Sequence, residues 1–331
     1  MKIVIATPFY PPEKGVSALY SSGLEKALIV RGHEVSVVPF STVARVPPGI
    51  RHLWYGLFLA QKSKGADYIL ALDTWSVGLP AYFVSKFLRL PLILRIGGDY
   101  LWESYAERTK KPIRFSDIYG ERAHFTWKEN LILRLTRTIV RHAHVLFFNT
   151  RFQISAWQPI YGFESKRAVV LENVYPARIA GIRPPQGKVF VAAGRPIALK
   201  NYDLLERVIT RIQKTNPGVS LDRRNLPPDE HRARLQDAYA VLIPSLSEIS
   251  SNTAIDAVIA GKPFIMTDDT GTKERLSELG LFIDTRSEDA LVAAIEKLLD
   301  PQVYEDYTQR IVQFGLTRTW DDLAEEICAH L

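Results

Sequence analysis

Two stretches in the second half of the chain hold residues suited to binding a charged ligand. The first contains Gly194, Arg195 and Lys200 and directly follows an apolar run at residues 189–193. A forked guanidinium and a compact ammonium, five residues apart on either side of a turn, can converge on one anion. Two solvated loop cations would give the same local sequence. This stretch alone therefore predicts an anion site but does not specify the ligand.

The second stretch joins a predicted strand to a predicted helix. Glu248 lies in the turn between them, and Asp256 lies about one turn inside the helix. The polar residues where the helix begins are Ser250, Ser251, Asn252 and Thr253. Free backbone N–H groups at a helix start bind anions. Two acidic acceptors around such a site suit a ligand with hydroxyls on both sides of its phosphates, and a well-capped helix is the alternative.

These stretches must be positioned by alternating strands and helices. Residues 2–7, 17–31 and 34–40 read as strand, helix and strand, a unit that predicts a parallel sheet covered by helices. Further strands are expected at residues 67–72, 91–96, 144–148, 189–193, 219–221, 241–244, 263–267 and 281–284. Residues 100–127 read as irregular. The chain is therefore expected to be α/β, and open parallel sheets bind ligands beyond the carboxyl ends of their strands.

A linker rich in Pro and Gly, residues 171–187, separates two such units at 1–170 and 188–317. With two sheets, the natural ligand site is the cleft between them. Of the 331 residues, the first 170 hold 23 Lys and Arg against 12 Asp and Glu, whereas the remainder hold 19 against 24. This asymmetry indicates that the two halves meet different partners, and a chance division of surface charge is the alternative.

The basic excess is densest between Arg108 and Arg141, where aromatic residues are interleaved. Such a region suits an anionic or lipid-linked acceptor, or an anionic membrane face. No recognised nucleic-acid module accompanies it, so we expect no nucleic-acid partner. The lone Cys328 excludes an intrachain disulfide, and no apolar run reaches the length of a bilayer span. These features favour a cytoplasmic location and leave peripheral attachment to the inner face of the plasma membrane open.

In their order and spacing, these motifs resemble the retaining GT-B glycosyltransferases, in particular glycosyltransferase family 4. The resemblance rests on residues 2–9, 31–35, 194–201, 248–256, 260–265 and 271–274. It implies two Rossmann-like, doubly wound domains facing a cleft, with acceptor binding in residues 1–170 and donor binding in residues 188–317. It also implies that the final helix, 318–331, packs on the N-terminal domain. The donor domain is expected to be short by about one strand and one helix.

The resemblance assigns roles to the two stretches. Arg195 and Lys200 would bind the donor diphosphate and stabilise the leaving nucleoside diphosphate. Glu248 would bind hydroxyls of the donor sugar, and Asp256 the ribose. The other donor-binding positions are Gly15, Asn173, Gly194, Ser251, Asn252 and Thr253. Asp256 stands where the family has Glu and is one methylene shorter, so its ribose contact is expected to be weaker or water-bridged.

On the acceptor side, Asp99 is the candidate group near the acceptor hydroxyl, as a base, and a strand-end turn is the alternative. Gly97 and Gly98 would leave room for the sugar, and Trp102 lies in the same stretch.

The expected reaction is metal-independent, retaining transfer from a nucleoside-diphosphate sugar to a glycan or lipid-linked acceptor in cell-surface polysaccharide synthesis. No cofactor or metal is expected, because no Asp-x-Asp triplet occurs and the basic pair would replace a metal. A non-catalytic glycan- or partner-binding module and a sugar-nucleotide epimerase are the alternatives.

Overall fold

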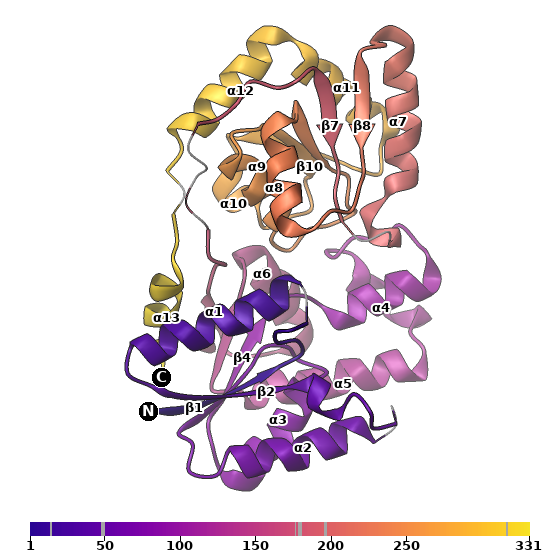
Figure 1. Ribbon diagram of the computed structural model, residues 1–331. Coiled ribbons are helices and arrows are strands. Elements are labelled where there is room, and N and C mark those ends of the chain that lie inside the picture. The colour runs from indigo at the N-terminus through magenta and orange to yellow at the C-terminus, as the bar shows by residue number, and fades with distance from the viewer. Residues whose placement is uncertain (14, 48–49, 176, 178–180, 195–196, 316) are drawn as a thin grey trace. The chain divides into compact units, whose positions relative to one another are not determined.

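The computed structural model describes residues 1–13, 15–47, 50–175, 177, 181–194, 197–315 and 317–331. It divides into two compact units (Figure 1). Unit 1 comprises Met1–Leu101, Glu121–Val174 and Arg318–Leu331, and unit 2 comprises Trp102–Gly120 and Tyr175–Thr317. Each unit contains one all-parallel sheet with helices on its faces, so the expected α/β architecture is confirmed. No helix of these described ranges has the length and apolar character needed to cross a bilayer.

Unit 1 is built on a six-stranded sheet of order β2-β1-β3-β4-β5-β6. Its strands are β1 (Lys2–Thr7), β2 (Glu34–Pro39), β3 (Tyr68–Ala71), β4 (Leu92–Ile96), β5 (Val145–Phe148) and β6 (Ala168–Val170). Its helices are α1 (Val16–Val30), α2 (Arg51–Lys62), α3 (Gly78–Leu88), α5 (Trp127–His142), α6 (Arg151–Tyr161) and α13 (Trp320–Cys328), with single turns η1 (Phe40–Val43) and η3 (Ser165–Arg167). The central strands are buried along their length, as expected where helices cover both faces.

The last helix of the chain, α13, packs beside the first helix, α1 (Figure 1). Trp320 lies against Gly23, where an added Cβ would sit 2.4 Å from the indole ring, so only glycine fits at this point of α1. The Arg31 guanidinium binds Asp321 through two hydrogen bonds of 2.8 and 3.0 Å, which orients the pair. Residues 318–331 thus complete the core of unit 1, although the preceding residues belong to unit 2.

Unit 2 is built on a five-stranded sheet of order β11-β10-β9-β7-β8. Its strands are β7 (Lys188–Val191), β8 (Val219–Asp222), β9 (Ala240–Ile243), β10 (Phe264–Thr267) and β11 (Gly280–Ile283). Its helices are α7 (Tyr202–Thr215), α8 (Pro228–Asp237), α9 (Asn252–Ile259), α10 (Lys273–Leu276), α11 (Glu288–Leu299) and α12 (Pro301–Gln313), with the single turn η4 (Ala198–Lys200). One core packs under α8, α9 and α10 and the other under α7 and α11, so both faces of the sheet are covered.

The stretch after β4 differs from the sequence expectation. Residues 100–127 include a helix, α4 (Tyr100–Thr109), and a turn, η2 (Ile118–His124). Residues 102–120 belong to unit 2 rather than to the N-terminal unit predicted at 1–170. These residues belong to unit 2 because they contact residues that are distant from them in the sequence, and a local sequence pattern does not reveal such contacts.

Candidate functional site

The candidate site lies at the carboxyl edge of the unit 2 sheet. The chain places β8 on one side of β7 and then returns to place β9 on the other. The position between β7 and β9, where the strand order reverses, is the switch point of the sheet. The loops after these two strands run in opposite directions and leave a crevice between them, and ligands of open parallel sheets bind in such a crevice. Lys200 follows β7 and Glu248 follows β9. The two side chains selected from the sequence therefore come from the two strands that flank the switch point.

Lys200 and Glu248 form an ion pair in which the ammonium Nζ lies 2.6 Å from the carboxylate Oε1. Their side chains are 25% and 15% exposed, so the pair is mostly shielded but still reachable by a ligand. Ser245 Oγ donates a second hydrogen bond to the same oxygen at 2.6 Å. Across the described ranges no residue donates to Oε2 of Glu248. One carboxylate oxygen thus holds the lysine, and the other is available to hydroxyl groups.

Gly194 gives Lys200 its space. Its φ is 146°, a conformation that favours glycine, and an added Cβ would lie 2.9 Å from the Tyr202 hydroxyl and 3.4 Å from Lys200 Cε. Any larger residue would push against the lysine stem. Arg195, the other predicted cation, lies outside the described residues.

Backbone and side-chain hydrogen bonds join the loops of the switch point. Leu246 N–H donates to the Leu199 carbonyl at 2.9 Å. Asn201 Nδ2 donates to the Thr285 carbonyl at 2.7 Å, and Thr285 Oγ1 donates to the Ser245 carbonyl at 2.8 Å. The loops after β7, β9 and β11 therefore hold one another, which pre-positions the ion pair.

Helix α9 begins beside this loop. Ser251 is its N-cap and accepts from Ala254 N–H at 3.3 Å, while its own N–H donates to Thr272 Oγ1 at 2.9 Å. Asn252 and Thr253 occupy the first turn and are partly exposed. The predicted polar helix start is thus present, and part of it serves as a cap.

Asp256 lies partly buried on α9, and desolvation raises the pKa of its carboxyl to about 6. Arg232 acts weakly in the opposite direction. No described residue donates a hydrogen bond to this carboxylate. Its ionised form is therefore destabilised by burial and open to a ligand donor such as a hydroxyl.

We expect Asp256→Asn to stabilise the protein at neutral pH. Because the pKa is raised, ionising Asp256 costs more free energy in the folded than in the unfolded state. This destabilisation is absent well below pH 3.8, grows as the pH rises and is complete above about pH 6. Two pKa units correspond to about 3 kcal/mol, which is an upper bound for the gain. Urea unfolding at about pH 8 and about pH 4 should show the stabilisation mainly at the higher pH.

Asp289→Asn provides the control, because that carboxylate is 83% exposed and its pair with Arg211 is at the surface. Its unfolding midpoint should change little at either pH. A loss of stability in Asp256→Asn at about pH 8 would show that the carboxylate has a favourable partner.

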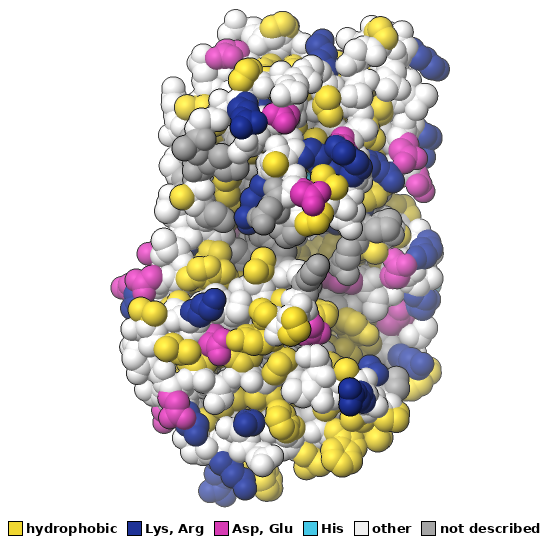
Figure 2. Space-filling model, viewed as in Figure 1, with side chains coloured by type: hydrophobic (Ala, Val, Ile, Leu, Met, Phe, Trp, Pro, Cys, Tyr) yellow, Lys and Arg dark blue, Asp and Glu magenta, His cyan; other side chains and the backbone are white. Residues whose placement is uncertain are grey.

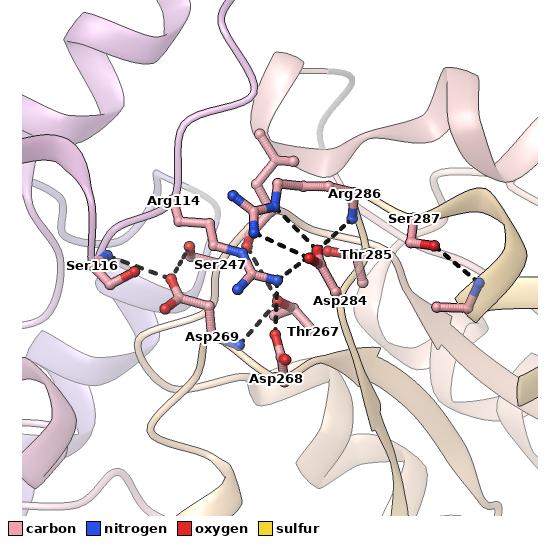
Figure 3. A network of polar contacts seen from close by, with 12 residues as sticks. Arg114, Ser116, Ser247, Thr267, Asp268, Asp269, Asp284, Thr285, Arg286 and Ser287 are labelled. Atoms are coloured by element: carbon pink, nitrogen blue, oxygen red, sulfur yellow. Dashed lines mark hydrogen bonds and ion pairs between the residues drawn. The ribbon is translucent and has the colours of Figure 1, made fainter. Parts of the chain in front are cut away.

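A segment of residues 113–117, which sequence reasoning missed, is anchored at the same sheet edge (Figure 3). Arg114 donates to Asp268 Oδ1 at 2.8 Å and to Asp284 Oδ1 at 2.6 Å, after strands β10 and β11. Phe115 N–H donates to Ser247 Oγ at 2.8 Å, and Ser247 donates to Asp269. Because Glu248 directly follows Ser247, this segment fixes the loop that carries the carboxylate.

The predicted acceptor-side residues have structural partners. Asp99 is 1% exposed and its Oδ2 accepts from Trp157 Nε1–H at 2.9 Å, and its role as a base near the acceptor hydroxyl stays a prediction. The Gly97 carbonyl accepts from Asn149 Nδ2 at 3.1 Å. Trp102 is 5% exposed, donates to the Ile113 carbonyl and lies in unit 2. It is a core residue of that unit.

Three further predicted positions, Gly15, Gly98 and Asn173, lie in unit 1. Gly98 accepts through its carbonyl from Gln153 Nε2 at 3.4 Å. Gly15 precedes α1 with a φ of 129°, which favours glycine. Asn173 Oδ1 accepts from the buried Arg95 at 2.9 Å. These residues are not brought together with Lys200 and Glu248 within one unit.

The unit 1 sheet has its own switch point, between β1 and β3, which the sequence did not single out. After β3, Asp73 Oδ1 accepts backbone N–H groups of Trp75, Val77 and Gly78 at 2.9–3.1 Å, so a carboxylate of the chain itself occupies the start of α3. Trp75 stacks on Tyr100 with ring centroids 5.7 Å apart. In the sequence, the signal that could have indicated this switch point is Asp73 and Trp75, an acid and an aromatic residue just after the strand predicted at residues 67–72.

The basic region between Arg108 and Arg141 divides between the units, with its part up to residue 120 in unit 2. Arg137 donates to the Ile160 carbonyl at 2.6 and 3.1 Å, and Arg141 to the Tyr161 carbonyl at 2.9 Å. These carbonyls lie at the C-terminus of α6, where cations are favoured by the helix dipole. Arg137 and Arg141 therefore stabilise the C-terminus of α6.

Comparisons with known proteins agree with this geometry. Residues 189–301 match the family described as Glycosyl transferases group 1. The chain is 22% identical to an uncharacterized glycosyltransferase of Methanocaldococcus jannaschii, covering 98% of this chain and 96% of that protein. A sucrose-phosphate synthase from Thermosynechococcus elongatus has a TM-score of 0.70 at 15% identity, covering 99% of this chain and 97% of that one.

Anabaena HepE, solved in complex with UDP-glucose, has a TM-score of 0.68 at 14% identity and covers all of both chains. These likenesses confirm the architecture expected from the sequence motifs. The chain therefore has the GT-B architecture, and its residues 189–301 match the family described as Glycosyl transferases group 1.

Proposed function

We propose that the protein is a retaining glycosyltransferase that moves a sugar from a nucleoside-diphosphate sugar to a glycan or lipid-linked acceptor without a metal. The observation that carries this proposal is the pair of Lys200 and Glu248 at the switch point of the sheet in unit 2, which contains the family match. A cation and a carboxylate with one open oxygen suit a ligand with phosphates beside hydroxyls. Anabaena HepE, whose fold is similar, has been solved with UDP-glucose.

In the donor complex, Lys200 leaves Glu248 and binds the diphosphate, where it stabilises the negative charge that develops as the sugar departs. Glu248 then accepts hydrogen bonds from sugar hydroxyls. Asp256 accepts from the ribose, and the first turn of α9, with Ser251 to Thr253, faces the distal phosphate. Arg195 joins Lys200 on the diphosphate.

This assignment needs no enzyme nucleophile. The acceptor hydroxyl attacks the face from which the leaving group departs. The bond between the anomeric carbon and the phosphate oxygen breaks, the glycosidic bond forms, and the hydroxyl proton passes to the departing phosphate oxygen. Catalysis then consists of positioning and of charge stabilisation by the basic residues. We assign the reaction to a cytoplasmic step of cell-surface polysaccharide synthesis, with an anionic or lipid-linked acceptor.

Wild-type protein should bind a nucleoside diphosphate and release it from the matching nucleotide sugar. A ligand that binds only the folded state raises the unfolding temperature, so a thermal-shift screen of UDP, GDP, ADP and their sugars identifies the base. The shift and the subsequent release of diphosphate should persist in excess EDTA, because the proposed charge stabilisation comes from side chains.

Controls with the nucleoside alone separate diphosphate binding from base stacking. Absence of binding to any nucleoside diphosphate would refute the proposal. Binding without turnover of any sugar donor would favour the non-catalytic module instead.

A further inference from the structure

Large apolar side chains are exposed on one layer of unit 1. Of the fifteen large hydrophobic side chains that the described structure exposes, seven lie on α2, α3 and α5, and Ile50 immediately precedes α2. Phe87 is 82% exposed, Trp127 72% and Leu53 66%. Helix α3 contacts both α2 and α5, so these side chains belong to one helical layer. Figure 2 shows hydrophobic side chains gathered over the lower part of unit 1, where Figure 1 places α2.

The helices expose these residues as separate outer faces. On α2, Tyr55 and Leu59 are fully buried, whereas Leu53, Trp54 and Leu57 point to solvent. On α3, Phe83 and Phe87 lie one turn apart on the exposed side. The layer is thus apolar on both of its sides, although only the inner side is needed for the core, and exposed patches of this kind mark an interaction surface.

The charge of this layer has one sign. Residues 35–66 and 74–98, which contain α2 and α3, have no Asp or Glu. Exposed cations lie among the apolar residues, including Lys62 on α2, Lys86 on α3 and Arg89 just after it. The acid of α5, Glu129, is buried and holds the capping box of that helix. No acid therefore opposes the cations on this face.

We propose that the outer face of α2 and α3, flanked by α5, binds the surface of an anionic lipid bilayer. Aromatic and aliphatic side chains that insert at the headgroup level, surrounded by Lys and Arg with no acid among them, are complementary to such a surface. A second copy of the chain would bring these cations against themselves, which disfavours self-association through this face.

The proposal goes beyond the proposed reaction and does not depend on it, because it concerns a face of unit 1 and not the switch point of unit 2. It also places membrane binding mainly on α2 and α3, which lie outside the basic region predicted at residues 108–141, and the face overlaps that region only at α5. A bilayer held on this face would keep unit 1 next to an acceptor with a lipid anchor.

Vesicle flotation tests the proposal with the full chain. The protein should float with vesicles of phosphatidylcholine and phosphatidylglycerol, bind at least tenfold less to phosphatidylcholine alone, and dissociate as salt screens the charges. A Trp54→Ser, Phe87→Ser double variant should lose at least tenfold in binding, and Lys86→Glu should weaken it selectively for the anionic vesicles. Val312→Ser, at a half-exposed position on α12 of unit 2, should bind as the wild type does.

Nucleotide binding, measured by thermal shift in every variant, should be unchanged, which shows that the variants fold and keeps this test separate from that of the proposed function. Absence of binding to anionic vesicles would overturn the proposal. So would a dimer in light scattering that the double variant disperses, because a second copy would then cover this face.

Discussion

Lys200→Met should weaken binding of UDP, or of the nucleoside diphosphate found to bind, about 10- to 100-fold, since a charge-assisted hydrogen bond contributes about 1.5–3 kcal/mol. Turnover should fall further, about 100- to 1000-fold, because the charge on the diphosphate is largest as the sugar departs. Titration calorimetry measures the first effect, and release of diphosphate from the sugar donor measures the second.

Loss of Lys200 also leaves the shielded carboxylate of Glu248 without its cation, so the single variant is expected to be less stable. The double variant Lys200→Met, Glu248→Gln removes both charges and should regain stability without regaining turnover. Lys214→Met, an exposed position on α7, is the matched control for the lost charge. If the double variant restored turnover, Lys200 would act only in folding.

The alternation of strands and helices made much of this site predictable. Lys200 and Glu248 are 48 residues apart, yet each lies in the connection that follows a strand, and parallel strands end at one edge of their sheet. Gly194 was likewise predictable, because it lies between the strand predicted at residues 189–193 and the cations Arg195 and Lys200. What the pattern could not show is that the two side chains bind each other, because the order of strands in the sheet decides which loops meet.

Residues whose partners are distant in sequence were harder to interpret. Asp99 follows a strand, like Glu248, but it is buried, and its carboxylate accepts a hydrogen bond from Trp157, 58 residues later. Arg114 reads as one of many loop cations, whereas its partners Asp268 and Asp284 lie 154 and 170 residues away. Neither outcome follows from local propensity, since burial depends on which elements pack together.

Arg114→Met should loosen the segment of residues 113–117 from the sheet edge. The side chain is 12% exposed and bridges Asp268 and Asp284, so its loss removes two charge-assisted hydrogen bonds, while Asp284 keeps its pair with Arg286. Each bond contributes about 1.5–3 kcal/mol, which predicts amide exchange at Phe115 at least about tenfold faster than in the wild type. Hydrogen–deuterium exchange of a peptide covering this segment measures the change.

The same variant should also loosen the loop that carries Glu248. Arg114 binds Asp268, and the next residue, Asp269, accepts from Ser247 through its carboxylate and from Glu248 N–H through its carbonyl at 3.1 Å. Exchange at the Glu248 amide should therefore rise together with exchange at Phe115, and turnover should fall with it. Arg114→Lys keeps the charge on a shorter side chain without the planar guanidinium, so it should give an intermediate effect. Lys110→Met removes a charge that is 62% exposed in the same stretch and should leave exchange unchanged. Unchanged exchange at Phe115 in Arg114→Met would show instead that apolar packing of Phe115 anchors the segment, since that ring is fully buried.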